Sequence, residues 1–433
     1  MRMSKLSPAT THDPARAAVP LGPFAVVVST LALLAVAACL RPPITSFGPV
    51  VSRVASETGL GAAELGLLGA LPVIGFALVS PVVAPIARRF GDGRTVLVAI
   101  VVLVVGLGLR FLPSLASLWV GTALVGVGIA VGNVLLPALV KRGFPAHLAL
   151  VTGLYTAVMG TFAALGSGLS VPIAEATGSW RLAIGCWIAL AVVALVAWSA
   201  RLRNDARSGA VAHRTRVAGA GRDAATDAMV ERGARPPSVW ASPTAWCVTA
   251  FMGLQSTGFY VTVTWLPSIE IASGVSERAA GWHLFLCQVV GIFAGLLVST
   301  RLGRTTDQRA IAALAGVPLV VACIGLVFAP GAVVLWAVLI GITQGATLTI
   351  ALALIGLRSA SAADTARLSG MAQGVGYGLA ALGPVVAGIL HDVFGSWHPV
   401  LWFVVGATAV QSLAALGAGR PLTVGHERTE VRA

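Results

Sequence analysis

RLRNDARSGAVAHRTRVAGAGRDAATDAMVERGARPPSV, residues 201–239, is the long polar interruption in a chain that is otherwise apolar from Pro20 to Leu416. This segment carries eight arginines against four acidic residues, so it cannot lie in a bilayer. Its glycine, alanine and charge content is typical of a flexible linker. The sequence therefore predicts two membrane halves, 20–200 and 240–419, joined by a basic linker and flanked by polar tails at 1–19 and 420–433.

The composition of the chain places it outside the soluble globular class. Hydrophobic residues make up 57% of the sequence and charged residues 10%, whereas about 25% of residues are charged in an average soluble domain. We therefore expect an all-α integral membrane protein.

Apolar segments of about 20 residues, enough to cross a bilayer as a helix, recur six times on each side of the linker. We place the first six spans near 22–46, 63–87, 94–112, 115–140, 148–174 and 179–200, and the second six near 240–268, 278–300, 309–329, 331–357, 365–391 and 397–417. The sequence thus predicts twelve transmembrane helices.

The net charge of +13 is explained by where the basic residues lie. With both termini and the linker in the cytoplasm, every Lys and Arg faces inward except five: Arg41, Arg53, Arg110, Arg181 and Arg278. This asymmetry follows the positive-inside rule. It favours a multi-pass protein of a bacterial plasma membrane, with both termini cytoplasmic, over a nucleic-acid-binding protein.

The two halves are related in sequence at a constant offset. Residues 151–181 align without gaps to 368–398, and the match ends with Gly-Ser-Trp at 178–180 and again at 395–397. Glu175 and Asp392 occupy the same register. A parallel duplication of six-helix units is the architecture of transporters whose halves rock about a central site.

The five cysteines (Cys39, Cys186, Cys247, Cys287, Cys323) all fall inside apolar runs, with no CxxC pair. They are expected to act as small packing residues, not as disulfides or metal ligands. The stretch Val36 to Cys39 also resembles a lipoprotein processing site, but cleavage there would remove the first span and reverse the linker.

Six stretches are informative together: LRPPITS at 40–46, LPV at 71–73, GNVLLPALVKR at 132–142, TGLY at 152–155, WLP at 265–267 and SGMAQGVGY at 369–377. With them the chain resembles the major facilitator superfamily, and within it the cyanate/2-nitroimidazole transporter-like (CynX/NimT) family. The chain departs from the family at Cys39, where similar members often have Asn two residues before the Arg. The superfamily's inner-loop motif survives only in part, as Arg88, Arg89, Asp92 and Arg94, and the resemblance implies a gating role for these four residues.

The resemblance implies a secondary carrier that moves a small polar or anionic solute by alternating access. Polar side chains inside spans are costly and therefore mark functional sites by default. The candidate substrate-binding residues are Arg41, Asn133, Tyr155, Gln255, Tyr260, Trp265, Gln344, Gln373 and Tyr377. For each amide or hydroxyl the alternative is a simple hydrogen bond between helices, and Gln288 is assigned to that alternative.

Arg41 is the strongest of these candidates. A guanidinium can hold an anion or a polarised nitro or carboxylate group with two parallel hydrogen bonds. The alternative is an arginine at the outer interface that contacts lipid phosphate.

His283 is the candidate for proton coupling. The acidic residues Glu64, Glu175, Glu270 and Asp392 fall near the ends of spans, which leaves His283 as the intramembrane group that titrates near neutral pH. We therefore expect either uniport or a modest pH dependence.

An enzyme finds no support in the sequence. There is no phosphate-binding loop, zinc-binding HExxH helix or nucleophile elbow. We expect no cofactor or metal, a small-molecule solute and membrane lipid as partners, and a monomer. A drug or metabolite efflux carrier of broader specificity and a non-transporting receptor or scaffold are the alternative functions.

Overall fold

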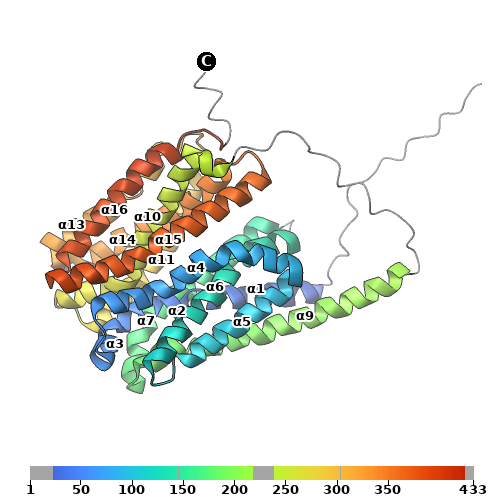
Figure 1. Ribbon diagram of the computed structural model, residues 1–433, viewed down its shortest axis with the longest axis horizontal. Helices are drawn as coiled ribbons and strands as arrows, with labels where there is room; N and C mark the ends of the chain where they lie inside the picture. The colour runs from blue at the N-terminus through green and yellow to red at the C-terminus, as the bar shows by residue number, and fades with distance from the viewer. Residues whose placement is uncertain (1–22, 145–146, 218–237, 303, 425–433) are drawn as a thin grey trace, which may run out of the picture.

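The computed structural model describes residues 23–144, 147–217, 238–302 and 304–424. Every regular element in these ranges is a helix. Figure 1 shows two bundles, one formed by the blue to green half of the chain and the other by the yellow to red half.

The N-terminal half contains six membrane segments, the first and last of which consist of several helices. Its elements are α1 (Pro23–Cys39), α2 (Pro42–Thr45), η1 (Gly48–Val50), α3 (Val51–Thr58), α4 (Ala62–Phe90), α5 (Asp92–Leu109), α6 (Leu115–Gly143), α7 (Leu148–Thr177), α8 (Trp180–Gly185) and α9 (Ile188–Val217).

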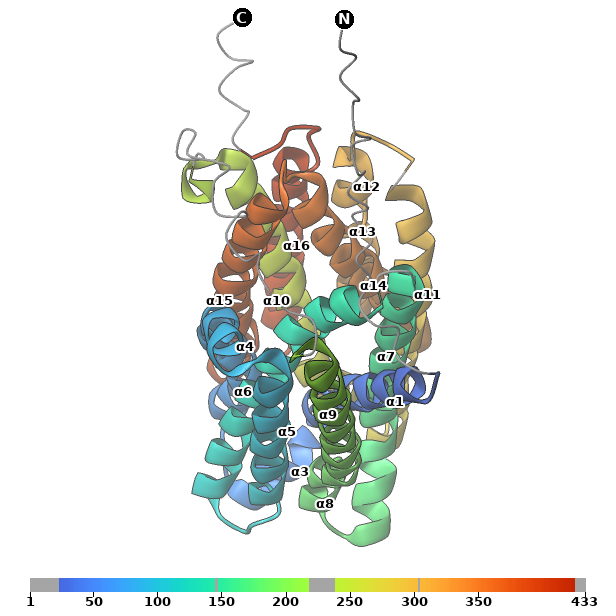
Figure 2. The same cartoon turned by 90° about the vertical axis from the view of Figure 1, so that its right-hand side faces the viewer.

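The C-terminal half repeats this plan, and its helices form the second bundle in Figure 2. Its elements are η3 (Val239–Ala241), α10 (Pro243–Ala272), α11 (Glu277–Leu302), α12 (Arg309–Leu314), α13 (Val317–Phe328), η4 (Pro330–Ala332), α14 (Val333–Leu357), α15 (Ala362–Phe394) and α16 (His398–Ala418).

In the described part of the chain, eleven helical segments are long and apolar enough to cross a membrane. The remaining long helix, α10, occupies the position of the seventh span but is richer in polar residues. Its buried hydroxyls bond to carbonyls one turn back on the same helix, as Thr249 does to Ala245 and Thr262 does to Gly258, both at 2.8 Å. These bonds satisfy the hydroxyls of Thr249 and Thr262 without water.

The first span differs from the predicted range of 22–46. It extends from Val27 to Thr58 and is interrupted after Cys39. Pro42 and Pro43 have no backbone N–H to donate to the preceding turn, which explains why the helix breaks there. Arg41 consequently lies near the middle of the span, not at its outer end.

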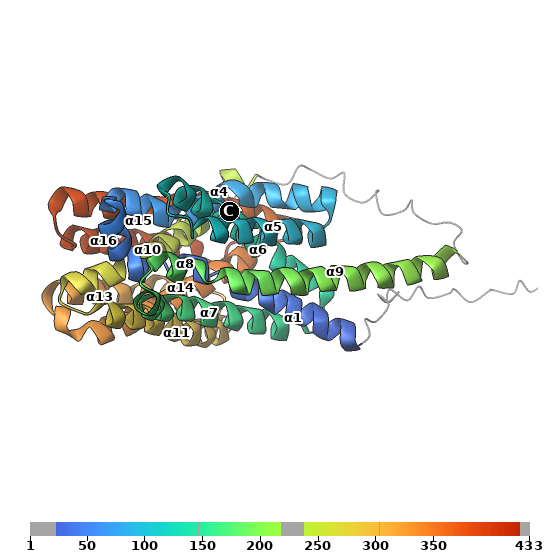
Figure 3. The same cartoon turned by 90° about the horizontal axis from the view of Figure 1, so that it is seen from below.

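The sixth span also continues beyond its predicted end near residue 200. Helix α9 extends to Val217, so the first part of the basic segment 201–239 is helical. Figure 3 shows α9 beside α1 and continuing past it. Residues 218–237 of the segment lie outside the described residues.

The internal repeat is visible in the backbone. Gly178 ends α7 and Gly395 ends α15, both in the left-handed conformation, at φ values of 67° and 62°. Gly59 and Gly274, also at positive φ, follow the first span of each half. Glycine adopts this conformation without a steric penalty, so equivalent turns use it in both halves.

The two halves meet mainly through α4 against α15 and α7 against α11. Glycines allow close contact there: a side-chain carbon on Gly66 would overlap the carbonyl oxygen of Pro384, and one on Gly388 would overlap that of Ala62. We call the end of the bundle that carries Thr58, Gly178, Ala272 and Gly395 the far end, and the opposite end the linker end.

Candidate functional site

The interruption of the first span holds Arg41 at the boundary between the two halves. Arg41 precedes the single-turn helix α2 and is half-buried. The adjacent backbone is fixed from three sides. Thr45 donates its hydroxyl to the carbonyl of Ala163 on α7 at 2.8 Å, Arg110 donates to the carbonyl of Pro43 at 2.7 Å, and Gly48 lies directly against Val263 on α10.

Aromatic residues of the C-terminal half surround the guanidinium of Arg41. Its Cζ lies 5.4 Å from the ring centre of Phe259, a distance at which a cation is attracted to the ring face. Tyr260, only 3% exposed, and Tyr377 lie close enough to Arg41 for their hydroxyls to interact electrostatically with its guanidinium. The structure thus brings together three of the predicted residues: Arg41, Tyr260 and Tyr377.

Tyr377 also connects this group to the N-terminal half. Its ring packs edge-on against Phe76 of α4, with ring centres 5.5 Å apart. Neither Phe259 nor Phe76 was a candidate from the sequence, because a phenylalanine in an apolar run is indistinguishable from a core residue. Among the described residues, no carboxylate lies within ion-pair distance of Arg41.

The predicted amides have different environments. Gln344 on α14 is 7% exposed, and neither its amide oxygen nor its nitrogen has a hydrogen-bond partner among the described residues. Gln255 donates to Ser256 at 2.6 Å and Gln373 donates to Ser369 at 2.7 Å, so both amides bond within their own helices. Gln344 is therefore the predicted amide with unused hydrogen-bonding capacity in the interior.

The remaining predicted residues are dispersed. Asn133 on α6 is half-buried and follows Gly132, which lies against the side chain of Leu40. Tyr155 on α7 is half-buried against the main apolar core. Trp265 donates its ring N–H to the carbonyl of Pro384 at 2.9 Å, a contact that joins α10 to α15.

Gln288, assigned to a bond between helices, has a buried amide nitrogen without a partner among the described residues. It lies on α11 next to Cys287. Cys287 packs against Gly341 of α14, the helix that also carries Gln344. Its amide group was visible in the sequence, but its environment was not.

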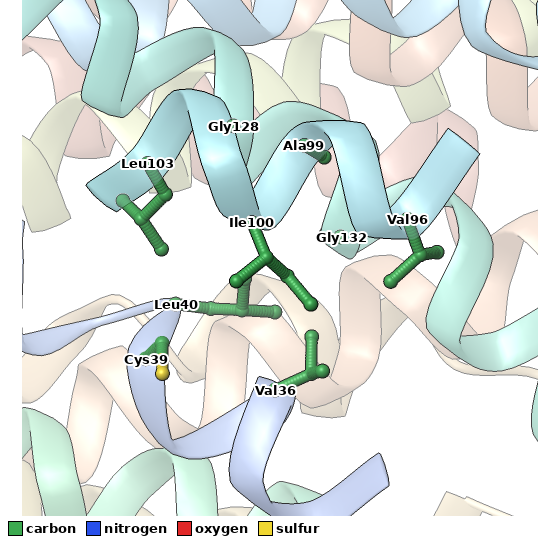
Figure 4. A pocket seen from close by; sticks show the side chains of 9 residues that line it. All are labelled: Val36, Cys39, Leu40, Val96, Ala99, Ile100, Leu103, Gly128 and Gly132. Carbon is green, nitrogen blue, oxygen red and sulfur yellow. The ribbon is translucent and has the colours of Figure 1, made fainter. Parts of the chain in front are cut away.

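A small pocket lies next to the break in the first span, but its lining is apolar. Figure 4 shows Val36, Leu40 and Ile100 pointing into the space between α1 and α5. Cys39 also lines it and bonds to the carbonyl of Ala35 at 3.1 Å. Because the thiol of Cys39 already has this partner and the other lining side chains are apolar, the pocket is a packing gap, not a site for a polar solute.

His283 is paired with an acid. Its Nδ1 lies 2.7 Å from Oε2 of Glu270, which is 1% exposed. The sequence placed Glu270 near the end of a span and gave it no role. Glu270 and His283 lie on either side of the short turn between two predicted helices. This closeness in the sequence was the signal that could have indicated a hydrogen-bonded pair.

The inner-loop residues lie at the linker end. Asp92 begins α5 and forms an ion pair with Arg142 of α6. Arg89 lies over the ring of Phe90 at 5.3 Å, while Arg88 and Arg94 are exposed. Asp92 and Arg142 thus link α5 and α6 within the N-terminal half.

Comparison with known proteins agrees with this architecture. The family model described as Major Facilitator Superfamily matches residues 27–381. The D-xylose-proton symporter structure superposes with a TM-score of 0.68 at 15% identity, over 93% of this chain and 98% of that one. At this identity the likeness shows the fold alone.

Three bacterial relatives align over most of their length. The uncharacterized transporter YycB of Bacillus subtilis is 41% identical over 88% of this chain and 90% of its own. The 2-nitroimidazole transporter of Escherichia coli is 39% identical over 91% of this chain and 96% of its own. The cyanate transport protein CynX of Escherichia coli is 28% identical over 85% of this chain and 91% of its own.

These matches confirm the predicted fold class and the predicted family, and they identify a multi-pass membrane transporter, not an enzyme. The chain belongs to the major facilitator superfamily, in the group that includes the 2-nitroimidazole and cyanate transporters.

Proposed function

We propose that this protein carries a small polar or anionic solute across the membrane by alternating access, with Arg41 as the group that holds the solute. The single observation that supports this most is the position of Arg41, at mid-span between the two halves and without a carboxylate partner among the described residues. In a low-dielectric interior a fixed positive charge requires a counter-charge. A negative or polarised group of the solute is suited to supply it.

The residues around Arg41 suit such a solute. The hydroxyls of Tyr260 and Tyr377 offer hydrogen bonds beside the guanidinium, and the ring of Phe259 provides a flat apolar surface. Cyanate is a small anion and 2-nitroimidazole a small ring with a polarised nitro group, which makes both suitable probes. Gln344, whose amide oxygen and nitrogen have no partner among the described residues, is a further candidate contact.

The contacts between the halves are consistent with a carrier closed at one end. Ion pairs join them at the far end, where Arg53 contacts Glu277 at 2.7 Å and Arg278 contacts Glu175. With both termini in the cytoplasm, as the basic residues favour, the far end is the outer one. All twelve helices belong to one chain, so we expect a monomer to suffice.

The test is uptake of labelled cyanate and of 2-nitroimidazole into proteoliposomes. Losing one side of a buried charged hydrogen bond costs about 2 to 5 kcal/mol. We therefore expect Arg41→Ala to weaken apparent affinity by about 30-fold or more. Arg41→Lys should impair it nearly as much, because lysine keeps the charge but loses the two-pronged geometry.

Arg304→Lys, at an exposed position of the linker end, is the matched control and should leave uptake unchanged. Normal affinity in Arg41→Ala would remove Arg41 from the site. Uptake of many unrelated compounds would favour the efflux carrier of broader specificity. Binding of a probe without uptake would favour the receptor.

A further inference from the structure

A second polar site lies at the far end of the C-terminal half, separate from Arg41. Glu270 is in the last turn of α10 and His283 in the second turn of α11. The Oε2 atom of Glu270 is 2.7 Å from Nδ1 of His283. The other oxygen, Oε1, is buried and has no hydrogen-bond partner among the described residues.

The surroundings of this pair contain little other charge. Cys287, one turn further along α11, is the other described titratable group that interacts electrostatically with Glu270, and its thiol donates to the carbonyl of Ala337 at 3.0 Å. Helix α14 carries no titratable residue.

The other charged groups of the far end have their own contacts or are exposed. From the remaining elements packed against α10 and α11, these groups are Arg53 and Glu57 of α3, Glu64 of α4, Glu175 of α7, Glu277 and Arg278 of α11, His391 and Asp392 of α15 and His398 of α16. Nothing in the described part of the chain therefore neutralises Glu270 except His283.

An ionised carboxylate alone in such a site is unfavourable for two reasons. Burial removes its hydration, and the last turn of a helix carries the negative end of the helix dipole. One proton shared between Oε2 and Nδ1 makes the pair neutral overall, whether as carboxylate and imidazolium or as acid and imidazole. Removing that proton leaves a net charge of −1.

We propose that Glu270 and His283 form a proton-binding site that is loaded while the far end is closed. The proton comes from solvent and enters the hydrogen bond between Oε2 and Nδ1. The side chain of His283 is 15% exposed and provides the route by which the proton enters. The side chain of Glu270 is only 1% exposed and is enclosed by protein.

The site can influence transport through the α10–α11 turn. Glu277 and Arg278 begin α11 immediately after this turn, and both form ion pairs with the N-terminal half. Loss of the proton would place an unneutralised charge beneath these contacts and favour opening of the far end. This coupling rests on the proposed transport function, whereas proton binding itself does not.

The proton site is tested first on purified protein without substrate. Thermal unfolding is followed from pH 5.5 to pH 9. The wild type should lose stability as pH rises, because deprotonation leaves the buried carboxylate unneutralised. Glu270→Gln and His283→Gln should each flatten this dependence, while His398→Gln, an exposed histidine at the same end, should retain it.

A measurement on the wild type covers the case in which the variants do not fold. Diethyl pyrocarbonate modifies neutral imidazole only, and mass spectrometry resolves each histidine. His283 should stay unmodified at a pH at which His398 is fully modified, and should react at higher pH. The proposal would be overturned if His283 and His398 reacted over the same pH range. It would also be overturned if unfolding of Glu270→Gln and of His283→Gln kept the pH dependence of the wild type.

Uptake of 2-nitroimidazole at different external pH then tests the coupling. Glu270→Gln should retain uptake but lose its pH dependence. If wild-type vesicles take up no probe, the transport proposal fails while the unfolding and modification data still decide whether the proton site exists. If wild-type uptake is pH-dependent and Glu270→Gln keeps that dependence, the coupling is wrong.

Discussion

Arg110 is a buried cation that acts on the binding region through the backbone. It is 2% exposed and donates to the carbonyl of Pro43 at 2.7 Å and to the hydroxyl of Thr122 at 3.2 Å. No described carboxylate pairs with it. Its role is to hold the broken first span, and thereby Arg41, against α5 and α6.

We expect Arg110→Lys to destabilise the protein by about 1.5 to 3 kcal/mol, the value of one hydrogen bond to a charged group, because lysine cannot reach both acceptors. The guanidinium stays protonated between pH 5 and 9. The deficit should therefore be constant from pH 5 to 9.

Denaturant unfolding at several pH values measures this, with Arg304→Lys as the control. A deficit that varies with pH in this range, or no deficit, would contradict the assigned role.

From the sequence, candidate site residues could be picked out where their chemistry is unusual for a membrane interior, and their role in binding stays a prediction. Arg41, Tyr260 and Tyr377 are such residues, and the structure places them together. Glu270 was missed because its distance from the end of a span says nothing about burial. The neighbours of Gln288 and Gln344 come from other helices, so the sequence could not show that their amides lack partners.

At the level of elements, apolar length predicted the spans well, but the meaning of prolines within them depended on context. Pro42 and Pro43 interrupt the first span, whereas Pro72, Pro81 and Pro85 lie within the continuous helix α4. A proline in a span is tolerated when neighbouring groups satisfy the freed carbonyl. At the break, Arg110 from a distant part of the chain satisfies the carbonyl of Pro43 itself.

Helix α9 offers a test of orientation, because it continues past the membrane into the basic segment 201–239. The arginines of this segment favour the cytoplasm. We expect a cysteine introduced at Ser208, in a background without accessible native cysteines, to react with an impermeant thiol reagent only after the cells are opened. Labelling in intact cells would reverse the orientation, and a cysteine at exposed Thr177 of the far end should label in intact cells as the control.

The whole molecule uses its internal repeat to close the far end. Glu175 and Asp392 occupy equivalent positions in the two halves, and each contacts the start of a helix in the opposite half. Glu175 binds Arg278 at the start of α11, and Asp392 accepts hydrogen bonds from the backbone N–H groups of Ala62 and Ala63 at 3.1 and 2.8 Å. The repeat was evident in the sequence. The contacts that Glu175 and Asp392 make across the interface could not be predicted from it.

Asp392 should therefore help to set the balance between the closed and open far end. Its bonds to the first turn of α4 exist only when the halves are together, and losing such a helix cap costs about 0.5 to 2 kcal/mol. We expect Asp392→Ala to shift the population toward the open far end by about fivefold, which corresponds to about 1 kcal/mol. Spin labels at Ala176 and Ala272, exposed positions in opposite halves of a cysteine-free background, would report this as a longer interspin distance.

Glu57→Gln is the matched control for this shift. Glu57 is also a far-end carboxylate, but its contacts to Trp180 at 2.6 Å and Arg181 at 3.1 Å stay within the N-terminal half. Its removal should leave the interspin distance unchanged, because these contacts are the same whether the far end is open or closed. An unchanged distance in Asp392→Ala would mean that the ion pairs of Arg53 and Arg278 hold the far end without the α4 cap.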